Sequence, residues 1–130
     1  MKILITGGSG MVGYGIQQIK NTFNHEFIFM SSKDCDLSNY EITLNYFKKI
    51  NPDYVIHLAA YVGGLFKNMN YKVDMLEKNL IMNYNVLKVC HILKIKKVIS
   101  CLSTCIFPDD TTYPINESML HSGPPHNSND

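Results

Sequence analysis

Residues 3–13 read Ile3-Leu4-Ile5-Thr6-Gly7-Gly8-Ser9-Gly10-Met11-Val12-Gly13. The apolar start predicts a short strand, and Ile16 and Ile19 continue the stretch at the spacing of a helix that begins near Met11. A strand that turns through glycines into a helix directs free backbone N–H groups and the positive end of the helix dipole at one point. We expect this point to bind the pyrophosphate of a dinucleotide, with a purely structural glycine turn as the alternative.

The three spaced glycines each have an expected task. Gly7 makes the tight turn, Gly10 lets the backbone approach the phosphates, and Gly13 lets helix and strand pack closely. Their spacing, Gly-x-x-Gly-x-x-Gly, resembles that of the extended short-chain dehydrogenase/reductase superfamily more than the Gly-x-Gly-x-x-Gly of the large dehydrogenases. The loop residues expected to bind the cofactor are Gly7, Gly8, Ser9, Gly10, Met11, Val12 and Gly13.

Composition places the chain among the globular proteins. Its 130 residues, 45% of them hydrophobic, suffice for the core of one domain. The net charge of +1, with dispersed lysines, favours neither nucleic acid nor a membrane surface as a partner. Since no apolar run reaches the roughly 20 residues of a membrane span and no signal peptide is evident, we expect a cytoplasmic protein. Free thiols, rather than a metal site or disulfides, are expected at Cys35, Cys90, Cys101 and Cys105.

Apolar runs and helical patterns alternate along the chain, which is typical of a parallel sheet covered on both faces. We therefore predict an α/β protein with a Rossmann-type doubly wound sheet, of which this chain supplies about four strands. The expected strands are 2–6, 26–31, 54–58 and 97–102, and the expected helices are 11–21, 39–50 and 73–93. Residues 109–130, rich in Pro, Asn and Ser, are expected to form an extended polar loop without an element of its own.

The end of the second expected strand bears on the choice of cofactor. In this fold an acid at that place binds the ribose 2′-hydroxyl of NAD, whereas a cation and hydroxyls hold the 2′-phosphate of NADP. The strand ends in two serines and a lysine, which favours NADP(H) with Ser32 and Lys33 as contacts. Asp34 and Asp36 keep NAD as an alternative, although Asp36 and Leu37 could equally lie beside the adenine ring.

The third expected strand runs into Leu58-Ala59-Ala60, where small side chains let a cofactor ribose lie against the backbone. His57 belongs to the strand pattern, so we expect a hydrogen-bonded core histidine rather than a catalyst. A glycine-containing loop, Val62-Gly63-Gly64, follows at the carboxyl edge of the sheet, where open α/β sheets bind their ligands.

The long helix expected at 73–93 starts with a capping pair, Asp74 and Glu77. Its apolar residues form two lines, one through Leu80 and one through Val86. A helix that is apolar on more than one face must bury a second face against something besides its own sheet. A homodimer contact explains this pattern, and so does a further segment that this chain lacks.

Ser103, Thr104 and Cys105 follow the fourth expected strand, at the same edge of the sheet. A serine hydroxyl can hydrogen-bond a carbonyl oxygen whose carbon receives a hydride, and a partly exposed cysteine can exchange a proton at a carbon next to a carbonyl. For Cys105 the alternative is a half-buried structural thiol.

Several stretches are similar to those of a known family. They are Met1-Lys2-Ile3-Leu4-Ile5-Thr6-Gly7-Gly8-Ser9-Gly10, Ser31-Ser32-Lys33-Asp34, His57-Leu58-Ala59-Ala60, Val62-Gly63-Gly64, Ser103-Thr104-Cys105-Ile106-Phe107-Pro108 and Pro124-Pro125-His126-Asn127-Ser128-Asn129. Through them the chain resembles the N-terminal part of the GDP-L-fucose synthase family, which acts on GDP-4-keto-6-deoxy-D-mannose as an NADPH-dependent 3,5-epimerase and 4-reductase. The resemblance implies that Ser103 is a catalytic serine and Cys105 an acid/base of the epimerisation. It also implies a nucleotide-sugar pocket bordered by Val62, Gly63, Gly64, Ser103 and Thr104.

The same resemblance indicates what these 130 residues do not contain. The family's catalytic Tyr-x-x-x-Lys motif, a second acid/base histidine and the substrate domain are all due beyond Asp130. Tyr84 and Lys88 match the motif, but they precede Ser103 within the long helix, and we interpret them as a chance match. We expect residues 1–130 to be the NADP(H)-binding part and to be inactive alone. Two alternatives are another extended sugar-nucleotide epimerase or dehydratase, and a short non-catalytic protein that binds NADP(H) or a partner.

Overall fold

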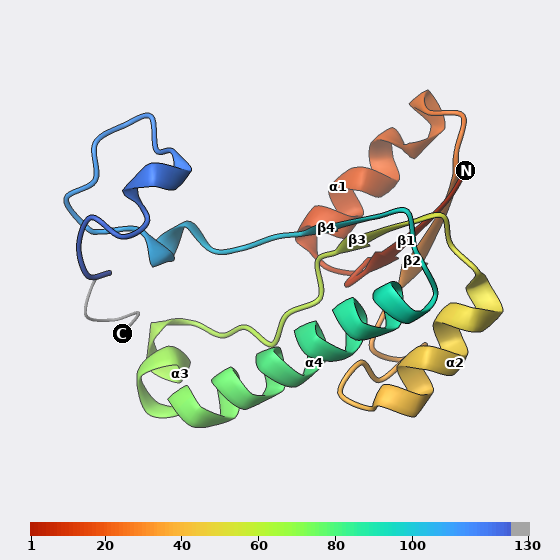
Figure 1. Ribbon diagram of the computed structural model, residues 1–130, viewed down its shortest axis with the longest axis horizontal. Helices are drawn as coiled ribbons and strands as arrows, with labels where there is room; N and C mark the ends of the chain where they lie inside the picture. Colours follow the sequence, from red (N-terminus) through yellow and green to blue (C-terminus); the bar gives the residue numbers. More distant parts are fainter. Residues whose placement is uncertain (126–130) are drawn as a thin grey trace. The chain divides into compact units, whose positions relative to one another are not determined.

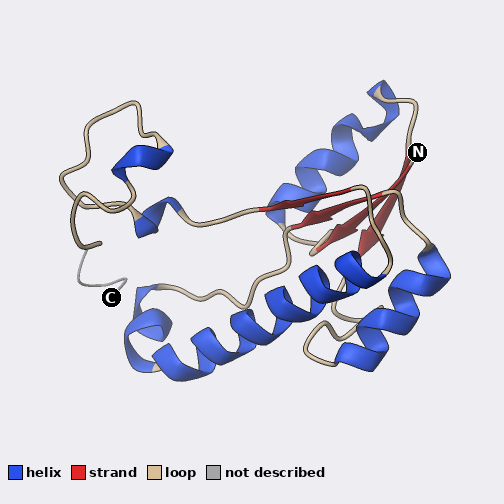
Figure 2. Ribbon diagram, in the orientation of Figure 1, coloured by secondary structure: helices blue, strands red, loops and turns tan. Residues whose placement is uncertain are grey.

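The computed structural model describes residues 1–125 and divides them into two compact units. The first unit consists of Met1–Val62 and Val73–Cys101. The second consists of Gly63–Lys72 and the described residues from Leu102 onward. The β-sheet belongs to the first unit (Figures 1 and 2).

The sheet has four parallel strands in the order β2-β1-β3-β4. In register, Ile5 of the central strand lies between Phe29 and Ile56 of its neighbours. Because all strands run in the same direction, their carboxyl ends meet at one edge, where α/β proteins bind their ligands. The bounds are β1 (Lys2–Thr6), β2 (Glu26–Met30), β3 (Tyr54–His57) and β4 (Lys97–Ser100).

Helices lie on both faces of this sheet, which confirms the predicted doubly wound α/β architecture (Figure 1). On one face, Leu4 and Val55 of the strands pack with Phe47 of α2 and Val89 of α4 in a fully buried core. The opposite face carries α1 and an aromatic row in which the rings of Phe27 and Phe29 stack at a centroid distance of 6.3 Å. The helix bounds are α1 (Met11–Ile19), α2 (Tyr40–Ile50) and α4 (Lys72–Ile92).

The ends of α2 follow from its flanking asparagines. The side-chain oxygen of Asn39 accepts a hydrogen bond from the Ile42 N–H at 3.1 Å, which satisfies one of the open N–H groups of the first turn. At the other end Asn51 adopts a left-handed conformation with φ of 50°, and Pro52 prevents the helix from continuing. The local sequence alone therefore fixes the length of this element.

His57 of β3 is the buried polar centre of the first unit. Its Nδ1 lies 2.6 Å from the Thr6 hydroxyl and its Nε2 lies 2.9 Å from the Asn83 side-chain oxygen. An amide oxygen can only accept, so Nε2 carries the proton and Nδ1 accepts from Thr6. Burial lowers the pKa of His57, while the Asn83 hydrogen bond opposes that shift. The predicted hydrogen-bonded core histidine is thus what the structure contains.

Asp53 joins three strands at the opposite, amino edge of the sheet. Its Oδ2 accepts a hydrogen bond from the Lys2 backbone N–H at 2.8 Å, and its Oδ1 pairs with the Lys96 Nζ at 2.7 Å. These donors, Lys96 first, lower the pKa of the Asp53 carboxyl. The pairing lies far along each strand from the edge at which a ligand is expected.

Four details of the secondary structure differ from expectation. A short helix, α3 (Leu65–Asn70), follows the Gly63-Gly64 pair where a loop was expected. The capping pair is wrong, because α4 already begins at Lys72 and Asp74 instead forms an ion pair with Lys78 at 2.9 Å. The polar segment after residue 109 contains a 3₁₀ turn, Glu117–Met119, while residues 126–130 lie outside the described range. Finally, β2 ends at Met30 and β4 at Ser100, so Ser31 and Cys101 lie outside the strands.

The buried histidine predicts a specific dependence of stability on pH. Because the folded state holds the pKa of His57 below its ordinary value of 6.5, the stabilisation is complete above that pH and is lost as the pH falls through it. We expect the free energy of unfolding to drop between about pH 7.5 and about pH 5.5, where ordinary carboxylates stay ionised. His57→Gln should reduce this drop and cost about 1–3 kcal/mol at the higher pH, since buried partners are left unpaired.

Urea unfolding at the two pH values measures both effects. The matched control is His25→Gln, since His25 is exposed and should leave the pH profile unchanged. An unaltered profile in His57→Gln, or an equal change in His25→Gln, would show that His57 does not govern the pH dependence.

Candidate functional site

A cavity of about 680 Å³ lies at the carboxyl edge of the sheet, within the first unit. Three segments of the chain form most of its wall: the glycine turn after β1, the loop after β2, and the segment after β3. The predicted cofactor residues that line it are Gly7, Ser9, Gly10, Met11, Val12, Gly13, Ser32, Asp36, Leu37, Leu58, Ala59 and Ala60, and of the predicted substrate residues Val62 lines it too. Gly8 and Lys33 do not line it. Segments far apart in sequence thus converge on one cavity.

The glycine turn brings the ends of β1 and β3 into direct backbone contact. Gly7 has a φ of +67°, and a Cβ atom placed on it would lie 2.7 Å from the Ala59 nitrogen. Only glycine fits both this conformation and this approach. At Gly13 an added Cβ would collide with the carbonyl group of Gly8, so the close packing of α1 is with the turn rather than with the strand.

The start of α1 faces the cavity without a side-chain cap. Its N-cap residue is Gly10, which can offer no hydroxyl or carboxylate to the N–H groups of the first turn. Helix N–H groups that lack an internal partner attract an anion, and the helix dipole adds to the attraction. Gly10 and Met11 both line the cavity, so this uncapped end opens into it.

Helix α4 holds the other two loops through two asparagines, one half-buried and one buried. Asn79 accepts a hydrogen bond from the Tyr61 N–H and donates one to the Tyr61 carbonyl oxygen, both at 2.8 Å. Asn85, which is almost fully buried, donates to the carbonyl oxygen of Leu37 at 2.9 Å. These bonds fix the backbone of the segments after β3 and after β2, respectively. Sequence reasoning missed both asparagines, although polar residues on an otherwise apolar helix were a signal.

Two acids after β2 are held by nearby serines. The Asp34 Oδ2 accepts from the Ser31 backbone N–H at 2.8 Å and from the Ser31 hydroxyl at 2.6 Å. The Asp36 Oδ1 accepts from the Ser38 N–H at 2.9 Å and from the Ser38 hydroxyl at 2.6 Å. Hydrogen bonding to these serine hydroxyls lowers the pKa of both carboxyls, which are therefore ionised at neutral pH.

The cavity also has lining residues that were not among the predicted site residues, namely Met30, Ser31, Cys35, Tyr61, Met82 and Cys101. Ser31 was expected as the last residue of its strand and Cys101 as strand interior, whereas β2 and β4 end one residue before them. Met82 comes from α4, where helical spacing alone could not tell the core from the cavity wall. The exposed thiol of Cys101 is the more accessible of the two cysteines at the site.

The predicted catalytic residues belong to the second unit. Ser103 precedes a 3₁₀ turn, Thr104–Ile106, and its Oγ accepts a hydrogen bond from the Cys105 N–H at 3.1 Å. Cys105 is exposed and, with Thr104, lines a small cavity of about 180 Å³. Gly63 and Gly64, also predicted at the substrate pocket, belong to this unit as well and precede α3.

Tyr84 and Lys88, the chance match to a catalytic motif, take part in packing between helices. The Lys88 Nζ lies 4.8 Å from the ring centroid of Tyr40, at the start of α2, and 5.3 Å from that of Tyr84. Neither residue lines the cavity at the sheet edge.

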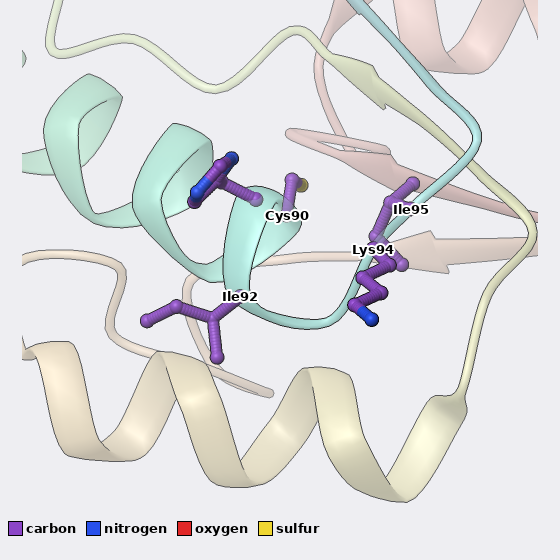
Figure 3. A pocket seen from close by; sticks show the side chains of 5 residues that line it. Cys90, Ile92, Lys94 and Ile95 are labelled. Carbon is purple, nitrogen blue, oxygen red and sulfur yellow. The ribbon is translucent and has the colours of Figure 1, made fainter.

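A separate hollow of about 540 Å³ lies where α4 ends, as Figure 3 shows. It arises from the helix end itself, since Lys94 takes a left-handed φ of 54° and Ile95 donates its N–H to the Cys90 carbonyl oxygen at 2.9 Å. Its lining consists of Cys90, His91, Ile92, Lys94 and Ile95. None of these is a predicted site residue, and burial raises the pKa of Cys90 to about 12.

The described residues bear on two kinds of function, membrane insertion and metal binding. Within residues 1–125, each helix is too short or too polar to cross a lipid bilayer. Over the same range, His, Cys, Asp and Glu side chains do not gather into a group of three that could hold a metal ion.

Comparison with known proteins gives one consistent result. The chain is 56% identical over 98% of its length to a GDP-L-fucose synthase from Dictyostelium discoideum and 50% identical over 98% to a probable GDP-L-fucose synthase from Drosophila melanogaster. It covers 41% of each of these relatives, so it spans about two fifths of their length.

The fold has close counterparts among solved structures. The crystal structure of a GDP-L-fucose synthetase from Naegleria fowleri bound to NADP matches with a TM-score of 0.85 and 51% identity, over 98% of this chain and 42% of that one. A family model, the NAD dependent epimerase/dehydratase family, matches residues 3–130. The glycine turn, the sheet-edge cavity and these matches together establish that the chain belongs to the NAD dependent epimerase/dehydratase family.

Proposed function

We propose that this chain is the NADP(H)-binding N-terminal portion of a GDP-L-fucose synthase. The single observation that carries the proposal is the cavity at the sheet edge, whose three walls are the glycine turn, the loop after β2 and the segment after β3. The high identity to GDP-L-fucose synthases supports the formation of GDP-L-fucose, and the family resemblance implies GDP-4-keto-6-deoxy-D-mannose as the substrate. The NADP bound to the Naegleria fowleri protein supports the cofactor.

The residues of the cavity fit a dinucleotide. A side chain at Gly7 would collide with the backbone of Ala59 and displace the turn, and the uncapped end of α1 offers N–H groups to a pyrophosphate. Leu58 and Ala59 line the cavity with apolar groups against which the ribose can lie, and Leu37, which also lines it, is assigned to the adenine ring. When bound, the reduced nicotinamide supplies a hydride to the ketone carbon of the substrate.

We assign the chemistry on the substrate to Ser103 and Cys105. Because the Ser103 Oγ accepts from the Cys105 N–H, the serine O–H remains available to donate to the ketone oxygen. That donation stabilises the enolate oxygen during epimerisation and the developing alkoxide during reduction. Cys105 acts as one acid/base of the epimerisation and exchanges a proton on one face of a carbon next to the ketone. The family resemblance implies that a second acid/base, a histidine, serves the opposite face. Val62, Gly63, Gly64 and Thr104 border the sugar nucleotide.

We also propose a homodimer through α4. Leu76, Leu80 and Leu87 are 68%, 63% and 50% exposed, and they form a stripe separate from the one that carries the buried Val86 and Val89. Contiguous apolar stripes of this kind are normally covered by protein. A second copy of the chain supplies such a cover, and a further part of a longer polypeptide is the alternative occupant.

Two other functions remain as alternatives. The relatives include a GDP-L-colitose synthase from Yersinia pseudotuberculosis, 35% identical over the whole of this chain, so another sugar-nucleotide reaction is the nearer alternative. A non-catalytic protein that binds NADP(H) or a partner is the other, because Tyr-x-x-x-Lys does not follow Ser103 within these 130 residues.

Cofactor binding is tested by calorimetric titration of the chain with NADPH. We expect saturable binding, and we expect Gly13→Ala to weaken it by about tenfold or more, since the added methyl group displaces the Gly8 carbonyl and the turn. Gly15→Ala is the matched control in the same helix, because an added Cβ there meets nothing within 4 Å. Its affinity should be unchanged, and its stability should rise by up to about 1 kcal/mol. Equal affinity in both variants would refute the assigned role of the turn.

Catalysis is tested by mixing the chain with NADPH and GDP-4-keto-6-deoxy-D-mannose. We expect no substrate-dependent loss of the reduced-nicotinamide absorbance, because the catalytic tyrosine and lysine implied by the family resemblance are not among these residues. The Dictyostelium discoideum synthase serves as the positive control under the same conditions. Measurable turnover by the chain, abolished in Ser103→Ala, would contradict the expected inactivity.

The homodimer is tested by sedimentation equilibrium. We expect twice the mass of one chain, and we expect Leu80→Glu to restore the mass of the monomer because a buried charge opposes association. Ile42→Glu, at a half-exposed site on α2, is the control and should stay dimeric. A monomeric unsubstituted chain would favour the alternative occupant of the stripe.

A further inference from the structure

The turn that follows β2 is organised around one serine. The Ser31 carbonyl oxygen accepts from the N–H groups of Asp34 at 3.1 Å and Cys35 at 3.3 Å. The Ser31 hydroxyl oxygen accepts from the Lys33 N–H at 3.3 Å and gives its own proton to the Asp34 carboxylate at 2.6 Å. The Ser31 N–H reaches the same carboxylate at 2.8 Å. Asp34 therefore closes the turn, and the N–H, the carbonyl oxygen and the hydroxyl of Ser31 all take part in its hydrogen bonds.

The Asp34 carboxylate is not offered to the cavity. Ser31 and Ser32 line the cavity, whereas Asp34 does not. An acid that selects NAD must present its oxygens to the ribose 2′-hydroxyl. The Asp34 Oδ2 accepts both hydrogen bonds from Ser31, and the residue does not line the cavity, so this carboxylate holds the loop.

The turn leaves two groups available for an anion. Among residues 1–125, neither the Ser32 hydroxyl nor the Lys33 ammonium group has a hydrogen-bond or ion-pair partner. Both side chains are exposed. Ser32 lines the cavity, and Lys33 is the next residue along the chain. A hydroxyl and an ammonium group on a fixed turn suit a phosphate monoester, which a flexible turn would bind less well because ordering costs entropy.

We propose that Asp34 is a positioning residue that sets the preference for NADP(H) over NAD(H), by locking the turn that presents Ser32 and Lys33 to the ribose 2′-phosphate. This inference rests on the proposed binding of NADP(H) in the same cavity. The Asp34 carboxylate affects phosphate binding in two opposite ways. Its negative charge repels the phosphate, whereas its hydrogen bonds to Ser31 hold the turn that binds the phosphate. The geometric role is the larger one.

The experiment compares NADPH and NADH affinities of the chain and of three variants by calorimetry, with adenosine 2′,5′-bisphosphate and adenosine 5′-monophosphate as smaller probes. Asp34→Ala should lower the NADPH-to-NADH affinity ratio by about tenfold, through weaker NADPH binding alone. Asp34→Asn should keep the ratio within about threefold, because its amide oxygen still accepts from Ser31. Asp53→Ala is the matched control. The Asp53 carboxylate also accepts a hydrogen bond from a backbone N–H, so its removal should likewise lower stability, but it lies at the amino edge of the sheet, away from the cavity. Its ratio should not change.

The outcomes separate the inference from the proposed function. If the unsubstituted chain prefers NADPH and Asp34→Ala keeps that preference, the positioning role of Asp34 is overturned while the proposed cofactor stands. A rise in NADPH affinity in both Asp34 variants would also overturn it, because charge would then outweigh geometry. If the unsubstituted chain binds neither nucleotide, the proposed function of the chain fails, and the role of Asp34 with it.

Discussion

Gly7 allows the backbone of β1 to meet the backbone after β3 with no side chain between them. The left-handed conformation of Gly7, and the 2.7 Å that a Cβ would leave to the Ala59 nitrogen, make this contact possible for glycine alone. The same Ala59 N–H donates to the Thr6 hydroxyl at 3.3 Å, and that hydroxyl in turn binds His57. The glycine turn and the buried histidine are therefore connected through Thr6 and Ala59. This network holds Gly7 and Ala59, which line the cavity, in place.

Helix α4 holds the same segments from one face of the sheet through the side chains of three asparagines. Its asparagines reach the loop after β2 through Asn85, the strand β3 through Asn83 and the segment after β3 through Asn79. A polar group shielded from water costs free energy unless it is paired, so the buried Asn85 and the half-buried Asn79 and Asn83 help to specify where each segment lies. The same helix carries the exposed apolar stripe of Leu76, Leu80 and Leu87. One helix therefore holds the segments around the cavity and also presents an apolar surface to solvent.

Much of the first unit could be predicted because local sequence decides it. Apolar runs of four or five residues predicted each strand, and the glycine spacing predicted the turn that leads into α1. Strand ends were less certain, since Ser31 and Cys101 continue the pattern of their strands but lie in the cavity wall. Whether an apolar or small residue is strand or wall depends on the neighbouring strand, which a single sequence does not reveal.

Long-range polar contacts were the other limit. Asn79 and Asn85 resemble solvated helix residues until the loops that they hold are placed against them. Asp34 was read as a potential ligand of NAD because sequence shows its charge and not its partner, Ser31. The helix α3 escaped notice because its six residues are too few to show a helical period. In each case the missing information was a contact rather than a propensity.

The most direct test of the account is to record backbone amide chemical shifts of the ¹⁵N-labelled chain while NADPH is added. The account predicts that the largest shift changes fall in the three segments that wall the cavity, 7–13, 31–37 and 58–62, with the amides near Asp53 unaffected. Changes confined to other parts of the chain, or no saturable change, would contradict the central claim that this sheet edge is a dinucleotide site.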